Sequence, residues 1–198
     1  ADGEYIAVGS GYYDNNKVYL FDKDSSTPLW NYTAGSGVNS VAISADGEYI
    51  AAGSQDDKVY QFNKDSSTPL WSYTTGDEVL SVSISADGEY IAAGSYDDKV
   101  YLFDKDSSTP LWNYTTGGWV RSVAISADGE YITAAAGDEV YLFHKDNGTP
   151  LWSYTTGGGV YSVAISSNGE TIVAGSLDNN VYLFNKDSST PLWSYSTG

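Results

Sequence analysis

The chain has 198 residues and a formal net charge of −17, with eighteen tyrosines, six tryptophans, twenty-one glycines and neither cysteine nor methionine. Without cysteine there is no disulfide framework, no thiolate metal site and no cysteine nucleophile. Nine basic residues against twenty-six acidic ones argue against nucleic acids and anionic membrane surfaces, whose phosphates require positive charge. No apolar run approaches the roughly 20 residues that cross a bilayer, so we expect no membrane insertion.

One unit is repeated five times along the chain. A tryptophan recurs at spacings of 41, 41, 40 and 41 residues, and each repeat carries an Asp-Gly-Glu or Asn-Gly-Glu turn. A period near 40 residues without a helical pattern is typical of a four-stranded propeller blade. We predict a single domain over residues 1–198, with repeat units at 1–35, 36–76, 77–117, 118–157 and 158–198. The repeated tryptophans are Trp30, Trp71, Trp112, Trp152 and Trp193.

In chain order, the first unit predicts strands b, c and d, and each later unit predicts strands a, b, c and d. The alternating apolar residues and flanking turn residues of the unit at 77–117 place these strands at 79–85, 90–95, 99–104 and 111–115. Strand a occurs only four times, at 38–44, 79–85, 120–126 and 160–166. The first blade therefore lacks its innermost strand. Three interpretations stay open: an open-edged five-blade ring, part of a larger propeller, or head-to-tail self-association.

Two stretches carry a family resemblance. Residues 81–97 resemble the core of a WD40-type repeat. Residues 102–112, from Leu102-Phe103-Asp104 through Ser107-Ser108 to Trp112, resemble the tryptophan-docking motif of quinoprotein (PQQ-like) propellers. The resemblance implies an all-β propeller of a prokaryotic secreted or surface type. It does not imply one function, since such repeats serve scaffolds, receptors and enzymes alike.

The copies differ from one another mainly on one face of the predicted disc. We call this the loop face, because it carries the connections from strand d to strand a and from strand b to strand c. Fourteen tyrosines and five tryptophans are periodic and are expected to pack between blades. The remaining aromatic residues and the only arginine fall on the loop face, which we predict to bind a protein or a glycan. The candidate residues are Tyr12, Tyr13, Asn39, Glu78, Leu80, Tyr96, Trp119, Arg121 and Tyr161.

Enzymatic functions fit the sequence poorly. Glycoside hydrolysis needs two carboxylates at a defined separation, and the non-periodic residues Glu78 and Glu139 suggest no such pair. His144 has no second histidine or cysteine to join in a metal or catalytic site. Quinone-dependent dehydrogenases of the resembled type use further basic residues and often a cysteine pair. We therefore expect no enzyme activity and no cofactor.

Calcium is a weaker hypothesis that rests on two repeated turns. Asp22 and Asp24, and likewise Asp104 and Asp106, place oxygen atoms at alternate positions. Local turn chemistry explains the same residues more simply, so we predict no metal site. Acidic pairs such as residues 56–57 are expected to be solvated turns between strands b and c.

Composition and three glycosylation sequons favour an extracellular or cell-surface location. The sequons begin at Asn31, Asn113 and Asn147. The sequence thus predicts a non-enzymatic extracellular propeller that acts as an interaction scaffold through its loop face. The alternatives are a glycan-binding, lectin-like module and a structural subunit of a ring or filament that associates edge to edge.

Overall fold

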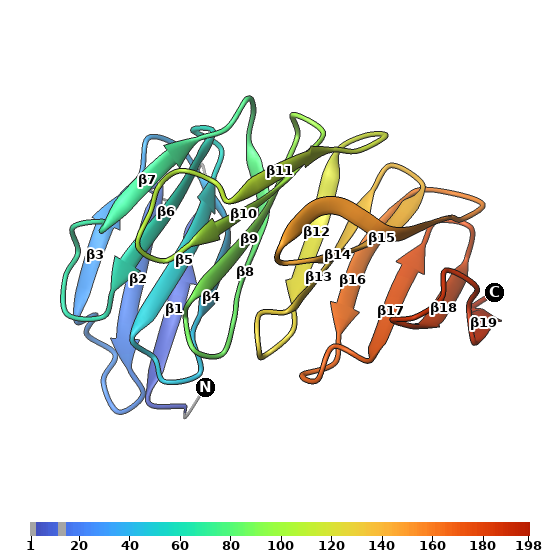
Figure 1. Cartoon of the computed structure of the whole chain (residues 1–198). Helices are drawn as coiled ribbons and strands as arrows, with labels where there is room; N and C mark the ends of the chain where they lie inside the picture. The colour runs from blue at the N-terminus through green and yellow to red at the C-terminus, as the bar shows by residue number, and fades with distance from the viewer. Residues whose placement is uncertain (1–2, 12–14) are drawn as a thin grey trace.

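The computed structural model describes residues 3–11 and 15–198, and these residues contain nineteen β-strands. The strands form five antiparallel meanders in chain order, the first with three strands and the others with four. Figure 1 shows the five sheets following one another along an open arc, with the first sheet at one end and the last at the other. The predicted all-β blade architecture, with a three-stranded first blade, is confirmed.

The five sheets are numbered here as blades 1 to 5. Blade 1 contains β1 (Tyr5–Gly9), β2 (Lys17–Asp22) and β3 (Trp30–Thr33). Blade 2 contains β4 (Val38–Ile43), β5 (Tyr49–Ser54), β6 (Lys58–Asn63) and β7 (Trp71–Thr74). Blade 3 contains β8 (Val79–Ile84), β9 (Tyr90–Ser95), β10 (Lys99–Asp104) and β11 (Trp112–Thr115). Blade 4 contains β12 (Val120–Ile125), β13 (Tyr131–Ala136), β14 (Glu139–His144) and β15 (Asn147–Thr155). Blade 5 contains β16 (Val160–Ile165), β17 (Thr171–Ser176), β18 (Asn180–Asn185) and β19 (Trp193–Ser196).

A tight turn joins the first two strands of each four-stranded blade. In blade 3 the Ser85 hydroxyl donates to Asp87 Oδ1 at 2.6 Å and accepts the Tyr90 N–H at 3.0 Å. Gly88 has a φ of +74°, which side chains with a Cβ rarely adopt. A Cβ there would also lie 2.6 Å from Tyr49 Cδ2 of blade 2. The repeated Asp-Gly-Glu motif therefore sets both the turn and the approach of the neighbouring blade.

The core lies between consecutive blades. Trp30 and Tyr32 of blade 1 place their ring centroids 5.3 Å and 5.2 Å from that of Phe62 in blade 2, which is fully buried. Such aromatic contacts contribute about 0.5–1.5 kcal/mol each beyond the area they bury. Equivalent residues form the same contacts at the three later junctions. Each blade is therefore held mainly by its neighbours along the arc.

Four of the repeated tryptophans also dock by a hydrogen bond. The indole Nε1–H of each donates to a lysine carbonyl at the turn between strands c and d of the next blade. The pairs are Trp30 with Lys64, Trp71 with Lys105, Trp112 with Lys145 and Trp152 with Lys186, all at 2.7–2.8 Å. Trp193 differs, because blade 5 is the last of the arc. Trp193 is 49% exposed, and among residues 3–11 and 15–198 its indole has no carbonyl to dock against.

The innermost strand of every four-stranded blade contains a β-bulge. The pairing register shifts between Val79 and Ser81 in blade 3, and at the equivalent positions of the other three blades. The Ser81 hydroxyl accepts the Val123 N–H of blade 4 at 3.1 Å, which ties the inner strands together. The bulged residues themselves are Asn39, Leu80, Arg121 and Tyr161.

Candidate binding face

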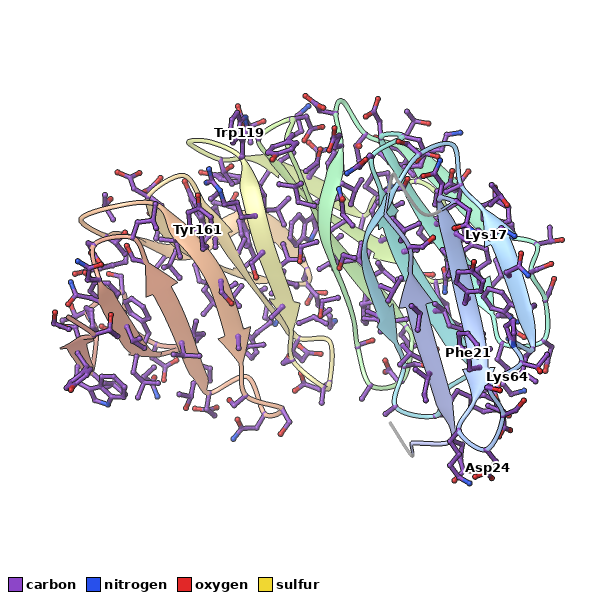
Figure 2. The ribbon with its side chains drawn as sticks, turned by 180° about the vertical axis from the view of Figure 1, so that it is seen from behind. Lys17, Phe21, Asp24, Lys64, Trp119 and Tyr161 are labelled. Atoms are coloured by element: carbon purple, nitrogen blue, oxygen red, sulfur yellow. The ribbon has the colours of Figure 1, made fainter. Side chains whose placement is uncertain are left out.

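The loop face lies at one edge of the arc. Figure 2 shows Trp119 and Tyr161 at this edge, and Asp24 and Lys64 at the opposite edge. The opposite edge repeats the same ion pairs in successive blades, for example Lys64 with Glu48 at 3.2 Å and Lys105 with Glu89 at 2.7 Å. The variable residues and the repeated ones are thus separated in space.

Four of the predicted binding residues form one contiguous group, the loop-face cluster of Tyr96, Trp119, Arg121 and Tyr161. The rings of Tyr96 and Trp119 meet edge to face, with centroids 4.8 Å apart. Arg121 Cζ lies 5.4 Å from the Trp119 ring and 4.8 Å from the Tyr161 ring. Trp119 and Tyr161 are 51% and 53% exposed. Blades 3, 4 and 5 therefore combine into one aromatic surface around a single guanidinium.

The bulges explain how this cluster is presented. A β-bulge leaves one residue outside the ladder and redirects its side chain. Arg121 and Tyr161 occupy the bulge position in adjacent blades, while their neighbours Val120 and Val160 are fully buried in the core. The core residues can thus stay constant while the bulged residue varies. The sequence alone indicated the variability of these positions but not the bulge.

The remaining predicted residues lie outside the cluster or outside the described structure. Asn39 is tied into the scaffold, since its Nδ2 donates to the Val79 carbonyl at 3.1 Å and its Oδ1 accepts from Gln55 at 3.0 Å. Glu78 and Leu80 are half-buried on blade 3. Tyr12 and Tyr13 lie outside the described residues.

The acidic turns between strands b and c are not merely solvated, and that expectation was wrong. Asp56 Oδ2 accepts the Gly35 N–H at 2.7 Å and the Tyr60 hydroxyl at 2.5 Å. Asp97 and Asp178 bind equivalent groups in blades 3 and 5. Burial and the hydrogen bond to Asp56 raise the pKa of Tyr60 above its usual range. These carboxylates are therefore part of the junction between blades.

Glu139 takes over one of these two contacts in blade 4, where the Gly117 N–H donates instead to the Tyr141 hydroxyl at 3.3 Å. The turn of residues 137–138 is one residue shorter than its counterparts, and the Glu139 carboxylate accepts the hydroxyl of Tyr141 in place of an aspartate. Burial and this hydrogen bond raise the pKa of Tyr141. The non-periodic glutamate thus compensates for a deletion. Sequence comparison between the repeats could have found this, because the missing aspartate and the new glutamate occur together.

The turns considered for calcium are held by local hydrogen bonds. Asp22 Oδ1 accepts the Asp24 N–H at 2.9 Å, and Asp104 Oδ1 accepts the Asp106 N–H at 2.8 Å. Asn63 Oδ1 accepts the Asp65 N–H in the same way. Residues 3–11 and 15–198 contain no group of three or more histidine, cysteine or acidic side chains placed to hold a metal ion. Over the same ranges, no helix has the length and apolar character needed to span a bilayer.

Comparison with known protein families identifies the family to which this repeat belongs. A family model described as outer membrane protein assembly factor BamB matches residues 1–116 and 80–198, which together span the chain. The chain belongs to this BamB-type family of PQQ-like propeller repeats. Comparison with curated proteins gave no match. The predicted resemblance to PQQ-like propellers is therefore confirmed, and the repeated indole-to-carbonyl contacts are the docking interactions of these BamB-type blades.

The loop-face cluster does not fit an anionic quinone cofactor. Arg121 is its only basic side chain, so the cluster offers a single positive charge. The lysines at the opposite edge each pair with the glutamate of the turn between strands a and b of the same blade. We derive no chemistry through such a cofactor in this BamB-type chain.

Grooves also lie between the BamB-type blades at the edge opposite the loop face. One, of about 340 Å³, is lined by Tyr90, Leu111, Trp112 and Lys145, together with Asp104 and Asp146. The equivalent groove between blades 1 and 2 has a volume of about 310 Å³. The same residue types line both grooves, so they follow from the repeated docking geometry. The residues of the loop-face cluster, in contrast, differ from blade to blade.

The three sequons lie on outer strands. Asn31, Asn113 and Asn147 are all exposed. Asn31 Oδ1 accepts a hydrogen bond from Lys17 Nζ at 2.8 Å, and Asn147 Oδ1 accepts the Thr149 N–H at 2.9 Å.

Proposed function

We propose that the chain is a non-enzymatic binding module whose loop-face cluster holds a segment of a partner protein. The observation that carries the proposal is the row formed by Tyr96, Trp119, Arg121 and Tyr161, in which three blades contribute to one exposed aromatic surface. Tryptophan, tyrosine and arginine are the residues that most often dominate the energy of protein interfaces.

The cluster supports this role because it is largely assembled before a partner arrives. Arg121 rests against two rings, and Trp119 rests against Tyr96. Side chains that are already ordered lose less conformational freedom on binding. The flat faces of the Trp119 and Tyr161 rings offer apolar contact. The Arg121 guanidinium offers several hydrogen-bond donors for a backbone carbonyl or a carboxylate of the partner.

Support for a non-enzymatic role comes from the carboxylates near this face. Asp56, Asp97 and Glu139 each accept a tyrosine hydroxyl at a blade junction. A carboxylate held in this way is a poor candidate for a catalytic role, because its hydrogen bonds already hold the fold together. The family description, an outer membrane protein assembly factor, adds support for a protein partner and for the extracellular or cell-surface location that we propose.

A glycan is the second candidate ligand. The exposed faces of Trp119 and Tyr161 suit stacking against a sugar ring as well as against a peptide. The two hypotheses differ in what the Arg121 guanidinium contacts, which would be hydroxyl groups in one case and carbonyl or carboxylate groups in the other.

Parallel peptide and glycan arrays test the proposal. The wild-type chain is compared with Trp119→Ala/Arg121→Ala/Tyr161→Ala and with a control, Leu70→Ala/Leu111→Ala/Leu151→Ala. The control leucines are 51–53% exposed and lie away from the loop face. We expect peptide binding by the wild type and the control and none by the cluster variant, with equal melting temperatures. Glycan binding alone would support the second candidate, and equal binding by all three proteins would contradict both.

A further inference from the structure

The guanidinium of Arg121 has no hydrogen-bond acceptor within the described part of the chain. Its Cζ lies 5.4 Å and 4.8 Å from the ring centroids of Trp119 and Tyr161, and no carboxylate of the described residues forms an ion pair with it. A ring face attracts the charge of a guanidinium, but it does not replace the oxygen atoms that accept its five N–H groups. The donors of this half-buried side chain are therefore left to solvent or to a ligand.

The lysines at the opposite edge show how the chain neutralises a cation that belongs to the scaffold. Lys64 pairs with Glu48 at 3.2 Å, and Lys105 pairs with Glu89 at 2.7 Å. The equivalent pair recurs in blades 4 and 5. Arg121 differs from these four lysines, because its position on the loop face brings it two rings and no carboxylate.

In two other blades, a side chain from the turn between strands b and c lies beside the bulged residue. In blade 2, Gln55 Nε2 donates to Oδ1 of the bulged Asn39 at 3.0 Å. In blade 5, Leu177 and the bulged Tyr161 border the same glycine. A Cβ on Gly159 would lie 3.6 Å from Leu177 Cδ1 and 3.7 Å from Tyr161 Cε2. The bulged side chain of each of these blades thus has a neighbour of matching polarity.

Blade 4 has a glycine at this turn position. The Gly137 N–H donates to the Trp119 carbonyl at 3.3 Å, as the Gln55 N–H donates to the Gly37 carbonyl at 2.8 Å in blade 2. Gly137 and Gln55 are therefore equivalent, and Gly137 offers no side chain to Arg121. An acceptor that a ligand brings to the guanidinium displaces no side chain of this turn.

The charge around the cluster favours a carboxylate over a phosphate as this acceptor. One guanidinium supplies one positive charge, which a carboxylate balances, whereas a phosphate carries about −1.5 to −2 at neutral pH. Glu78 lies on the same face, with its carbonyl accepting the Tyr96 N–H at 2.9 Å. A second negative charge on the ligand would meet this acidic neighbour and a chain of charge −17.

We infer that the loop-face cluster recognises a carboxylate of its partner segment, which binds the Arg121 guanidinium through two parallel hydrogen bonds. Trp119 and Tyr161 hold the guanidinium in place, and their exposed faces contact the apolar groups that flank the carboxylate. A guanidinium matches a carboxylate in geometry as well as in charge. The inference rests on the proposed function, since it specifies what that face binds. An acidic side chain and a C-terminal carboxylate are the two sources of this chemistry.

The net charge of the chain makes such a preference easy to distinguish from non-specific attraction. A protein of charge −17 repels acidic peptides and attracts basic ones at long range. At physiological ionic strength the Debye length is about 8 Å, so the repulsion is weakened but keeps its sign. A preference for peptides that carry a carboxylate must therefore come from a local contact.

A peptide array with matched sequences tests the inference. Each short random peptide with a single aspartate or glutamate is printed beside twins that carry the corresponding amide, a lysine or a phosphoserine instead. Every peptide is printed with a free and with an amidated C-terminus. The proteins are the wild type, Arg121→Gln, and the control Lys99→Gln, which removes the same charge from blade 3 outside the cluster. Other blades carry Asn39, Leu80 and Tyr161 at the bulge position, so Arg121→Gln should fold. Arg121→Leu replaces it if its melting temperature falls.

We expect the wild type and Lys99→Gln to bind carboxylate peptides at least about tenfold more tightly than the twins that lack that carboxylate. Arg121→Gln should bind both kinds equally. Loss of binding on amidation of the C-terminus identifies the C-terminal carboxylate as the ligand, and loss in the amide twin identifies an acidic side chain.

Three results would each overturn the inference: equal binding by the wild type with and without either carboxylate, a preference for the lysine or phosphoserine twin, and a carboxylate preference that survives in Arg121→Gln. Equal binding of the twins that still depends on Trp119 and Tyr161 would leave the proposed function standing. A wild type that binds no peptide at all would contradict both.

Discussion

Arg121 lies with its Cζ 4.8 Å from the centroid of the Tyr161 ring, and the two residues occupy the same bulge position in adjacent blades. The contact therefore follows from the repeat itself: two equivalent positions on neighbouring inner strands face each other across the junction. A repeat protein that varies only its bulged residues can build a surface without disturbing the core, because the flanking valines stay buried. Arg121 and Tyr161 of the loop-face cluster are presented in this way, and Tyr96 and Trp119 extend the surface from the adjoining loops.

Replacing Arg121 with lysine should weaken ligand binding by about tenfold or more while leaving the melting temperature unchanged. Lysine keeps the charge, but it lacks the planar guanidinium that stacks on the Trp119 and Tyr161 rings. Fluorescence anisotropy with a peptide taken from the array measures the effect. The control is Lys99→Arg, a lysine-to-arginine exchange on blade 3 and outside the loop-face cluster. Equal affinity for Arg121→Lys and wild type would mean that charge alone matters.

Gln61→Leu should stabilise the fold. Gln61 is fully buried on β6, neither its Nε2 nor its Oε1 has a hydrogen-bond partner, and the equivalent blades carry a leucine such as Leu102. Removing unsatisfied buried polar atoms from an apolar site should raise the free energy of unfolding by about 1–3 kcal/mol. Urea denaturation measures the change. The reciprocal variant Leu102→Gln should lower the free energy of unfolding, and a loss of stability in both variants would contradict the explanation.

Two substitutions test how much the indole hydrogen bond contributes to the free energy of unfolding. Trp71→Phe removes a bond to the Lys105 carbonyl at 2.8 Å and should lower the free energy of unfolding by about 1–3 kcal/mol, which includes the lost contact area. Trp193 is 49% exposed and its indole makes no such bond among the described residues, so Trp193→Phe should cost less than about 0.5 kcal/mol. Equal losses in chemical denaturation would show that ring size, and not the hydrogen bond, accounts for the effect.

Alkaline pH should destabilise the protein. Burial and carboxylate hydrogen bonds raise the pKa values of Tyr60, Tyr101 and Tyr141 above the ordinary value of 10.0. The unfolded chain then releases these protons near pH 10 while the folded chain retains them, so stability is full below pH 10 and falls as the pH rises further. Thermal denaturation from about pH 8 to above pH 10 should show this loss. Tyr60→Phe should reduce the slope, whereas Tyr195→Phe, at an exposed ring, should not.

Much of the fold could be predicted from the sequence because its signals are local. The strands of residues 77–117 follow from alternating apolar residues and from the turn at Gly88, and they match β8 to β11 to within one residue at each end. The open arc could not be predicted, since the angle between blades depends on packing at the junctions. The structural role of Asp56 was missed for a similar reason, because its partner Gly35 lies 21 residues away on another blade.

The candidate site was predicted as a face but not as a cluster. Divergence between the copies located Tyr96, Trp119, Arg121 and Tyr161. Their mutual contacts depend on the bulges, and a bulge is a property of the pairing between two strands. The same pattern included Asn39, whose side chain instead bridges to the Val79 carbonyl. Variability thus identifies the surface, and geometry decides which of its residues act together.

Calorimetric titration of the best peptide from the array into three proteins tests the central claim most directly. The proteins are the wild type, the variant with alanine at Trp119, Arg121 and Tyr161, and the control with alanine at Leu70, Leu111 and Leu151. The loop-face cluster predicts saturable binding with the same Kd for the wild type and the control, and no detectable heat of binding for the cluster variant. A cluster variant that binds with the Kd of the wild type would contradict the assignment of this face as the binding site.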